Sequence, residues 1–202
     1  MSRLQAALAL LVRELGACGK SVALVGGLAV SARAEPRLTR DVDLAVAVAA
    51  DADAEALVRW LLAAGFSTLA LVEQETTRRL ATIRVGLPGE SARGVVGDLL
   101  FASSGIEPLL VEKADPLEVF PGLVVPVARI GHLIALKLLS RDDRSRPQDR
   151  IDLTALFRFA TKEDLSEAGE AVRRIEEAGF ARGRDLTRAL ADWMRQGSAA
   201  SE

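Results

Sequence analysis

The chain has 202 residues, with 26 Lys and Arg against 28 Asp and Glu and a formal net charge of −2. Half of its residues are hydrophobic, which is typical of a folded protein and excludes general disorder. The balanced charge argues against a protein that coats nucleic acid non-specifically, although it allows a local basic face. The length fits one domain, or a catalytic unit with a helical appendage.

Three features of the sequence bear on location. Cys18 is the single cysteine, so the chain forms no intramolecular disulfide. No segment is apolar over the length that a bilayer requires, and Gln5, Arg13 and Glu14 interrupt the pattern of a signal peptide. We expect a cytoplasmic protein with no membrane partner.

The first two thirds of the chain alternate between helical and strand patterns. Leucines at helical spacing predict a first helix, and apolar runs bounded by Gly, Pro and polar residues predict strands. The expected elements are a helix over 4–15, a strand over 21–25, a short helix over 28–33, a strand over 42–48, a helix from 51 to about 65, and strands over 66–72, 79–85 and 95–101, with a short strand at 123–125.

The last third changes to helical patterns. Two helices are expected over 129–139 and 149–159. A third should start at a capping box formed by Thr161 and Asp164, and a fourth should contain Leu186, Leu190 and Trp193. A strand-rich front and a helical rear predict an α+β fold with a mixed β-sheet. We expect residues 1–127 to form the catalytic core and residues 128–202 to form a C-terminal helical region that completes the cleft.

Asp41 and Asp43 are the most informative pair of residues. They lie two positions apart in an apolar strand, so both carboxylates leave the same face, roughly 7 Å apart along the backbone. Two such charges repel each other unless a cation lies between them, and hard divalent ions prefer oxygen ligands shared with phosphates. The pair therefore predicts an Mg2+ or Mn2+ site in nucleotide chemistry, with a solvated edge strand as the alternative.

Gly26 and Gly27 follow the strand over 21–25 and open a helical segment. The free N–H groups of a helix start attract anions, and glycine lets a ligand approach the backbone closely. An ordinary tight turn would also explain an isolated Gly-Gly pair. Together with Asp41 and Asp43, the pair predicts a site for the triphosphate of an NTP.

The two motifs together resemble the signature of the polymerase-beta-type nucleotidyltransferase superfamily. The wider pattern from Arg37 through Thr39 to Asp41, Val42, Asp43 and Leu44 resembles the branch of AbiEii-type and MenT-like toxin nucleotidyltransferases. The resemblance is strongest at 25–46, 98–107 and 129–153. It implies that Arg37, Thr39 and Arg40 line the cleft and contact phosphate or RNA.

Asp98 interrupts an otherwise apolar strand. An isolated buried carboxylate is costly, whereas a third metal ligand facing Asp41 and Asp43 would be stabilised by the cation. The alternative is a strand end with Asp98 in solvent. The resemblance implies a third acid on a later strand, which helps to deprotonate the attacking hydroxyl.

Lys137 interrupts an apolar helix and is one of four lysines in the chain. Its ammonium group would suit a triphosphate in the cleft, although a surface lysine with its stem packed would have the same pattern. The resemblance implies contact with the nucleotide phosphates. Asp149 and Asp152 lie one helical turn apart, so they could hold Lys137 or Arg146 in place, or act on a hydroxyl. The resemblance makes Asp152 the preferred functional acid, whereas Asp149 could only cap its helix.

These residues predict a metal-dependent nucleotidyltransferase that transfers NMP from an NTP to an acceptor hydroxyl. The resemblance to MenT-like enzymes implies that the acceptor is the 3′ end of tRNA, and that the protein is a toxin with a cognate antitoxin as partner. Two alternatives remain open at this point. One is a small-molecule (antibiotic-type) or protein nucleotidyltransferase, and the other is a non-catalytic nucleotide-binding regulatory module.

Overall fold

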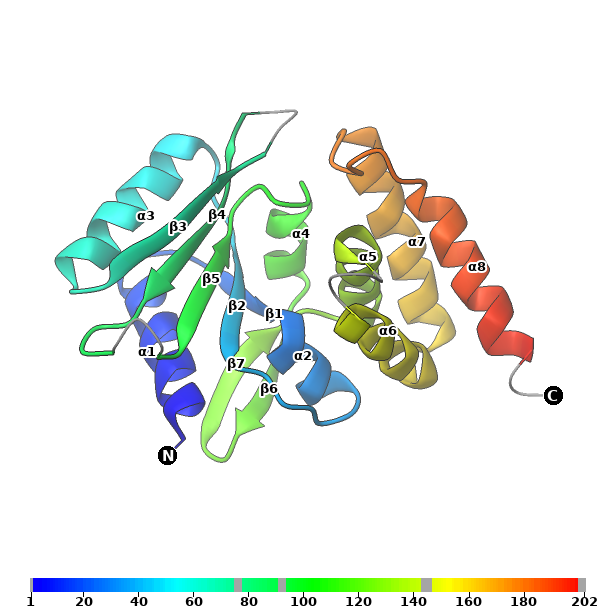
Figure 1. The fold of residues 1–202 in the computed structure, drawn as a ribbon, viewed down its shortest axis with the longest axis horizontal. Coiled ribbons are helices and arrows are strands. Elements are labelled where there is room, and N and C mark those ends of the chain that lie inside the picture. The colour runs from blue at the N-terminus through cyan, green and yellow to red at the C-terminus, as the bar shows by residue number, and fades with distance from the viewer. Residues whose placement is uncertain (1, 75–77, 91–93, 143–146, 200–202) are drawn as a thin grey trace.

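The computed structural model describes residues 2–74, 78–90, 94–142 and 147–199, and the side chains of 197–199 are not described. Figure 1 shows a strand-rich half and a helical half side by side. The helices are α1 (Arg3–Ala17), α2 (Gly26–Arg33), α3 (Asp51–Ala63), α4 (Glu107–Glu112), α5 (Ile130–Ser140), α6 (Pro147–Phe159), α7 (Lys162–Glu177) and α8 (Leu186–Ala199). The strands are β1 (Val22–Val25), β2 (Asp41–Val46), β3 (Ser67–Glu73), β4 (Leu80–Gly86), β5 (Val96–Leu100), β6 (Asp115–Phe120) and β7 (Leu123–Val127).

The strands that the structure describes form one seven-stranded sheet in the order β3-β4-β5-β2-β1-β7-β6. The β2–β5 and β1–β7 pairs are parallel, and the β3–β4, β4–β5, β1–β2 and β6–β7 pairs are antiparallel. The sheet is therefore mixed, as the sequence predicts. The parallel β2–β5 pair sets Asp43 directly opposite Asp98, because Cα partners in this register run from Asp41 and Val96 onward.

One face of the sheet is covered by α1. The methyl groups of Leu11 lie so close to β5 that a Cβ atom at Gly97 would be 2.7 Å from the Leu11 Cδ1. Leu8, Leu11 and Leu15 are fully buried, and so are Val42 and Leu44 of β2. Since side chains alternate along a strand, this packing directs Asp41 and Asp43 to the opposite face.

Two elements differ from the sequence prediction. Residues 107–112 form α4 and residues 115–120 form β6, whereas the sequence predicts no element there and only a short strand at 123–125. Helix α4 has six residues, which is too short for a recognisable periodicity. Pro116 lowers the strand signal of β6, but β6 lies at the edge of the sheet, where proline is tolerated.

The helical half follows the prediction closely. Thr161 and Asp164 make both hydrogen bonds of the capping box at the start of α7. The change from strands to helices falls between Val127 and Ile130, next to the predicted boundary, and the division into two parts stays a prediction. Within the described ranges, none of the helices combines the length and apolar character needed to cross a membrane.

Close contact between α5 and α7 depends on Gly131. A Cβ atom at this position would lie 2.3 Å from the backbone oxygen of Asp164 and 2.8 Å from the Cβ of Glu167. The helix pair must separate to admit a side chain, although alanine has the higher helix propensity.

We expect Gly131→Ala to lower the free energy of unfolding by about 2 kcal/mol, because the added methyl group overpacks the interface. The matched control is Gly169→Ala in α7, where the nearest atom to a Cβ is an Arg173 nitrogen at 3.6 Å. That variant is expected to gain up to about 1 kcal/mol from helix propensity alone. Urea denaturation followed by circular dichroism measures both, and equal stability of the two variants would contradict the packing argument.

Candidate active site

The turn from β1 into α2 is shaped by the residues that pack against it. Gly26 has φ +63°, and a Cβ atom there would lie 2.0 Å from the Oδ2 of Asp43. A Cβ atom at Gly27 would lie 2.5 Å from an Arg37 nitrogen and 2.8 Å from the Oγ1 of Thr39. The two glycines thus allow an acid, a base and a hydroxyl to lie against the start of a helix.

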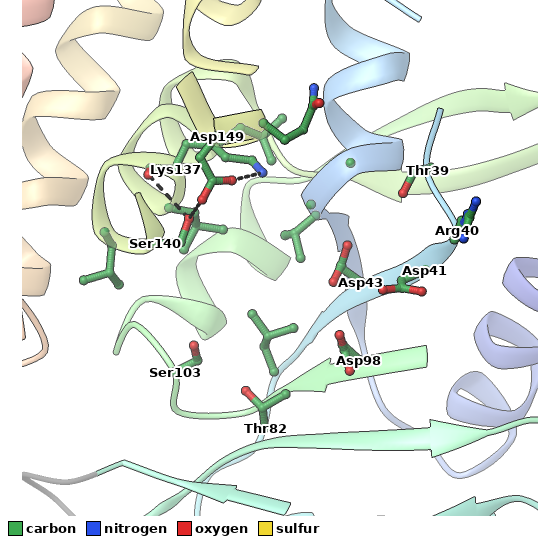
Figure 2. Close-up of a pocket in the computed structure, with 18 of the residues that line it drawn as sticks. Thr39, Arg40, Asp41, Asp43, Thr82, Asp98, Ser103, Lys137, Ser140 and Asp149 are labelled. Carbon is green, nitrogen blue, oxygen red and sulfur yellow. Dashed lines mark hydrogen bonds and ion pairs between the residues drawn. The ribbon is translucent and has the colours of Figure 1, made fainter. Parts of the chain in front are cut away.

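Three carboxylates gather on the face of the sheet opposite α1. Asp41 and Asp43 come from β2, and Asp98 lies opposite Asp43 on β5. Figure 2 shows the three side chains on neighbouring strands, with Lys137 and Asp149 on the helices across the pocket. The structure thus brings together the three acids that the sequence singles out, and their role as metal ligands stays a prediction.

Asp43 has a perturbed pKa. Burial raises the pKa of its carboxyl from 3.8 to about 6, with further contributions from the charges of Asp98 and Asp41. Lys137 and the backbone amide of Gly27 act in the opposite direction. An acid cluster of this kind favours cation binding, because a positive charge would reduce the repulsion between the carboxylates.

Arg84 of β4 contacts the acid cluster directly. Its Nε donates to the Oδ1 of Asp98 at 2.8 Å, and its Nη2 donates to the Oδ2 at 2.6 Å. The same Nη2 lies 3.7 Å from the Oδ2 of Asp41. Arg84 was not predicted as a site residue. Its signal is a charged side chain in an apolar strand, on the same face as Thr82 two residues earlier.

Lys137 lies between two buried carboxylates of α6. Its Nζ is 2.8 Å from the Oδ1 of Asp149 and 2.7 Å from the Oδ2 of Asp152. The hydroxyl of Ser140 also donates to Asp149, at 3.1 Å. The predicted role of the two acids in holding Lys137 is therefore present, while Arg146 lies outside the described residues. Asp149 is the third residue of α6 and not its cap.

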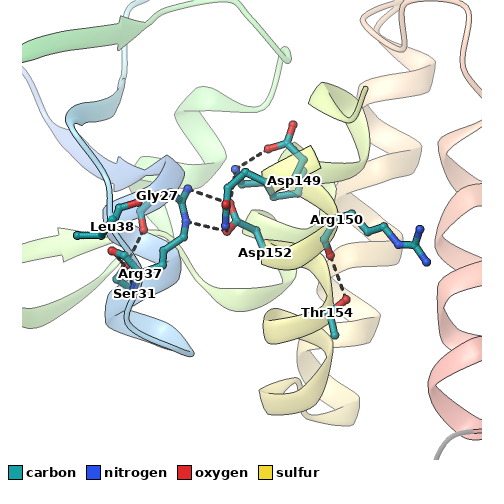
Figure 3. A network of polar contacts seen from close by, with 10 residues as sticks. Gly27, Ser31, Arg37, Leu38, Asp149, Arg150, Asp152 and Thr154 are labelled. Carbon is teal, nitrogen blue, oxygen red and sulfur yellow. Dashed lines mark hydrogen bonds and ion pairs between the residues drawn. The ribbon is translucent and has the colours of Figure 1, made fainter. Parts of the chain in front are cut away.

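Arg37 joins the loop before β2 to α6. Its Nε lies 2.7 Å from the Oδ1 of Asp152, and its Nη2 donates to the Oδ2 at 3.0 Å, as Figure 3 shows. Asp152 is 1% exposed, so it is a buried acid shared by Arg37 and Lys137. In this arrangement Arg37 orients the loop that carries Thr39.

These residues surround a pocket of about 770 Å³, a volume within the range of small-ligand sites. Of the predicted residues, Asp152 lies behind the lining and the others form part of it. Residues that the sequence analysis missed are Arg84, Ser103, Ser140 and Arg182. The full lining is Val25, Gly26, Gly27, Arg37, Leu38, Thr39, Arg40, Asp41, Asp43, Thr82, Arg84, Asp98, Leu100, Ser103, Leu133, Leu136, Lys137, Leu139, Ser140, Pro147, Gln148, Asp149 and Arg182.

The donor set of the pocket fits a hard divalent cation. Asp41, Asp43 and Asp98 offer only carboxylate oxygens, which Mg2+ and Mn2+ prefer. In the ranges that the structure describes, no three His, Cys, Asp or Glu side chains are arranged to hold a metal ion as they stand. Both oxygens of Asp98 accept a hydrogen bond from Arg84, so the lone pairs that face the guanidinium are open to a metal ion only if one of the two groups moves.

The fold is similar to that of a nucleotidyltransferase-like protein of known structure. An antigenic nucleotidyltransferase-like protein from Paracoccidioides brasiliensis matches with a TM-score of 0.54 and 19% identity, over 94% of this chain and 92% of that chain. A putative nucleotidyltransferase from H. pylori matches with a TM-score of 0.46 and 13% identity, over 98% of this chain and 95% of that chain. No curated protein matches the chain by sequence.

Sequence comparison narrows the class. Residues 9–201 match the family described as nucleotidyl transferase AbiEii toxin of type IV toxin–antitoxin (TA) systems. This match defines a nucleotidyltransferase. The chain belongs to the AbiEii family of toxin nucleotidyltransferases.

The raised pKa of Asp43 links stability to pH. The unfolded carboxyl keeps its ordinary pKa near 3.8 and the folded one titrates near 6, so its contribution to stability is present below about pH 4 and is lost as the pH rises through 6. In metal-free buffer, Asp43→Asn should therefore raise the free energy of unfolding at pH 7.5 by about 1 to 2 kcal/mol, with little change at pH 4. Urea titrations in EDTA at both pH values measure this, with Glu55→Gln on the surface as control.

The pairing of Lys137 with two buried acids makes a second prediction about stability. Lys137→Met leaves Asp149 and Asp152 without the ammonium group, and the free energy of unfolding should fall by about 3 kcal/mol. Lys113→Met, at an exposed position, should change it by less than about 0.5 kcal/mol. Adding Asp149→Asn to Lys137→Met should restore part of the loss. An additive further loss would show that the charges do not act as a unit.

Proposed function

We propose that this nucleotidyltransferase transfers NMP from an NTP to the 3′ end of tRNA in an Mg2+-dependent reaction, and thereby acts as a growth-inhibiting toxin. The convergence of Asp41, Asp43 and Asp98 beside the Gly26-Gly27 turn is the observation that carries the proposal. Acids on neighbouring strands and a pocket of about 770 Å³ beside a helix start suit a triphosphate and the hydroxyl that attacks it.

The proposed reaction forms one bond and breaks another. The acceptor hydroxyl oxygen bonds to the α-phosphorus, and the bond from that phosphorus to the oxygen bridging to the β-phosphate breaks. Pyrophosphate leaves with the electron pair of the broken bond. The hydroxyl proton passes to a carboxylate of the cluster, for which we propose Asp98.

We assign some residues of the pocket to the phosphates and others to the metal ion. Gly26 and Gly27 line the pocket at the start of α2, where backbone N–H groups would bind the triphosphate, while Thr39 lies against Gly27. Asp41, Asp43 and Asp98 would hold Mg2+ or Mn2+, and the ion would neutralise charge on the phosphates. Lys137 contributes from the opposite wall, where Asp149 and Asp152 fix its position and leave the third N–H donor of its ammonium group for a phosphate.

We assign Arg37 and Asp152 to positioning. The two-point pairing between them orders the loop that precedes Asp41. A guanidinium group that already pairs with a buried carboxylate is less available for phosphate than one that is unpaired, so Arg37 acts mainly through Thr39 and the loop backbone. Asp152 acts through Lys137 and Arg37 in the same way.

A transfer assay tests the proposal. The protein is incubated with each α-labelled NTP, Mg2+ and total tRNA, and Asp41→Ala/Asp43→Ala is compared with the surface variant Glu55→Gln. We expect labelled tRNA with the wild type and with Glu55→Gln, and a loss of at least about 100-fold with the double variant or with EDTA. Induced expression should arrest growth of a bacterial host only when transfer is intact.

Other outcomes identify the alternatives. Label on a small hydroxyl compound or on protein, and none on tRNA, would overturn the tRNA acceptor and leave the nucleotidyltransferase assignment in place. Binding of NTP with no transfer to RNA, protein or small acceptors would favour a regulatory module. The cognate antitoxin that the family implies would be sought as a neighbouring gene whose co-expression restores growth.

A further inference from the structure

Arg84 places a positive charge next to the acid cluster, and no sequence motif predicts this contact. The β4–β5 register sets Arg84 opposite Asp98, so its side chain leaves the sheet on the same face as the three acids. Both of its contacts with Asp98 are shorter than 3 Å, and they form a two-point pair of the kind that guanidinium makes with carboxylate.

Two other bases of the pocket are paired with acids outside the cluster. Lys137 pairs with Asp149 and Asp152, and Arg37 pairs with Asp152. Among the described residues, Arg84 is the base that lies within ion-pair distance of the cluster, at Asp98 and at Asp41. Arg84 is therefore the positive charge that the described structure places next to the three acids. It pairs with Asp98, which is one of the three proposed metal ligands.

The pair is also suited to exchange. The side chain of Asp98 is 15% exposed, whereas that of Arg84 is 44% exposed, so the guanidinium can move into solvent without burying a charge. An ion pair with one exposed partner contributes little to stability. A divalent cation carries twice the charge of the guanidinium and can contact two carboxylates at once.

We propose that Arg84 is a resident counter-ion of the acid cluster and that a divalent cation binds Asp98 only by displacing the Arg84 guanidinium. Arg84 thereby balances part of the negative charge of the metal-free cluster and weakens metal binding. The proposal rests on the metal site of the proposed function. It assigns to Arg84 a positioning role, because the residue acts through Asp98.

Metal binding without nucleotide tests this directly. Isothermal titration calorimetry with Mn2+ compares the wild type with Arg84→Met, Arg84→Lys and the surface control Arg59→Met, each checked for folding by circular dichroism. We expect Arg84→Met to bind Mn2+ about fivefold more tightly than the wild type, and Arg59→Met to match the wild type. Arg84→Lys keeps the charge and loses the two-point pair, so its affinity should lie between the two.

A second measurement on the wild type does not depend on a variant folding. The NMR resonance of the Arg84 Nε–H, identified by its loss in Arg84→Lys, reports the hydrogen bond to Asp98. Titration with Mg2+ should move this resonance toward that of a solvated arginine. An unmoved resonance at saturating Mg2+ would overturn the proposal.

The outcomes separate this proposal from the proposed function. Equal or weaker Mn2+ binding by Arg84→Met, with clear binding by the wild type, would overturn the exchange and leave the metal site intact. Absence of binding by both proteins would overturn the exchange and the metal site together. Binding that persists in Asp41→Asn/Asp43→Asn would place the ion outside the cluster and would also overturn the exchange.

Discussion

The buried network of Lys137, Asp149, Asp152 and Arg37 is the interaction on which the architecture of the site depends. Two positive and two negative side chains from α5, α6 and the loop before β2 meet there; Lys137, Asp149 and Asp152 are buried, and Arg37 is partly exposed. Buried charges are tolerated only when they are paired, so the helical half cannot shift relative to the loop without exposing an unpaired ion. The network thereby fixes the distance between the two walls of the pocket.

The acid cluster, in contrast, carries charges that the protein does not fully balance. Asp41, Asp43 and Asp98 lie close together with fewer positive partners than negative charges, and the burial of Asp43 adds to the repulsion. A folded protein can keep such a cluster because the surrounding core is large and apolar, with α1 packed on the other face of the sheet. The pocket thus contains two different sets of charged residues. The charges of the Lys137 network balance within the protein, whereas the acid cluster keeps an excess of negative charge that would bind a cation.

Much of this arrangement was predictable from local sequence. The spacing of Asp41 and Asp43, the apolar strand around Asp98 and the isolation of Lys137 in an apolar helix each identify a residue by its immediate neighbours. Pairings across long separations were not predictable. Arg37 and Asp152 are 115 residues apart, and Arg84 meets Asp98 through a strand register that the sequence does not specify. Short or edge elements such as α4 and β6 were missed because their patterns are weak.

The close packing at Gly27 has a consequence for how relatives of this chain can differ. The space that a side chain would need there is filled by the guanidinium of Arg37 and the hydroxyl of Thr39. A homologue with serine at the second position of the turn must move or replace Arg37, and Asp152 then loses its two-point partner. Positions 27, 37 and 152 should therefore covary during evolution, and their joint identity would sort related enzymes into subgroups with different loop geometry.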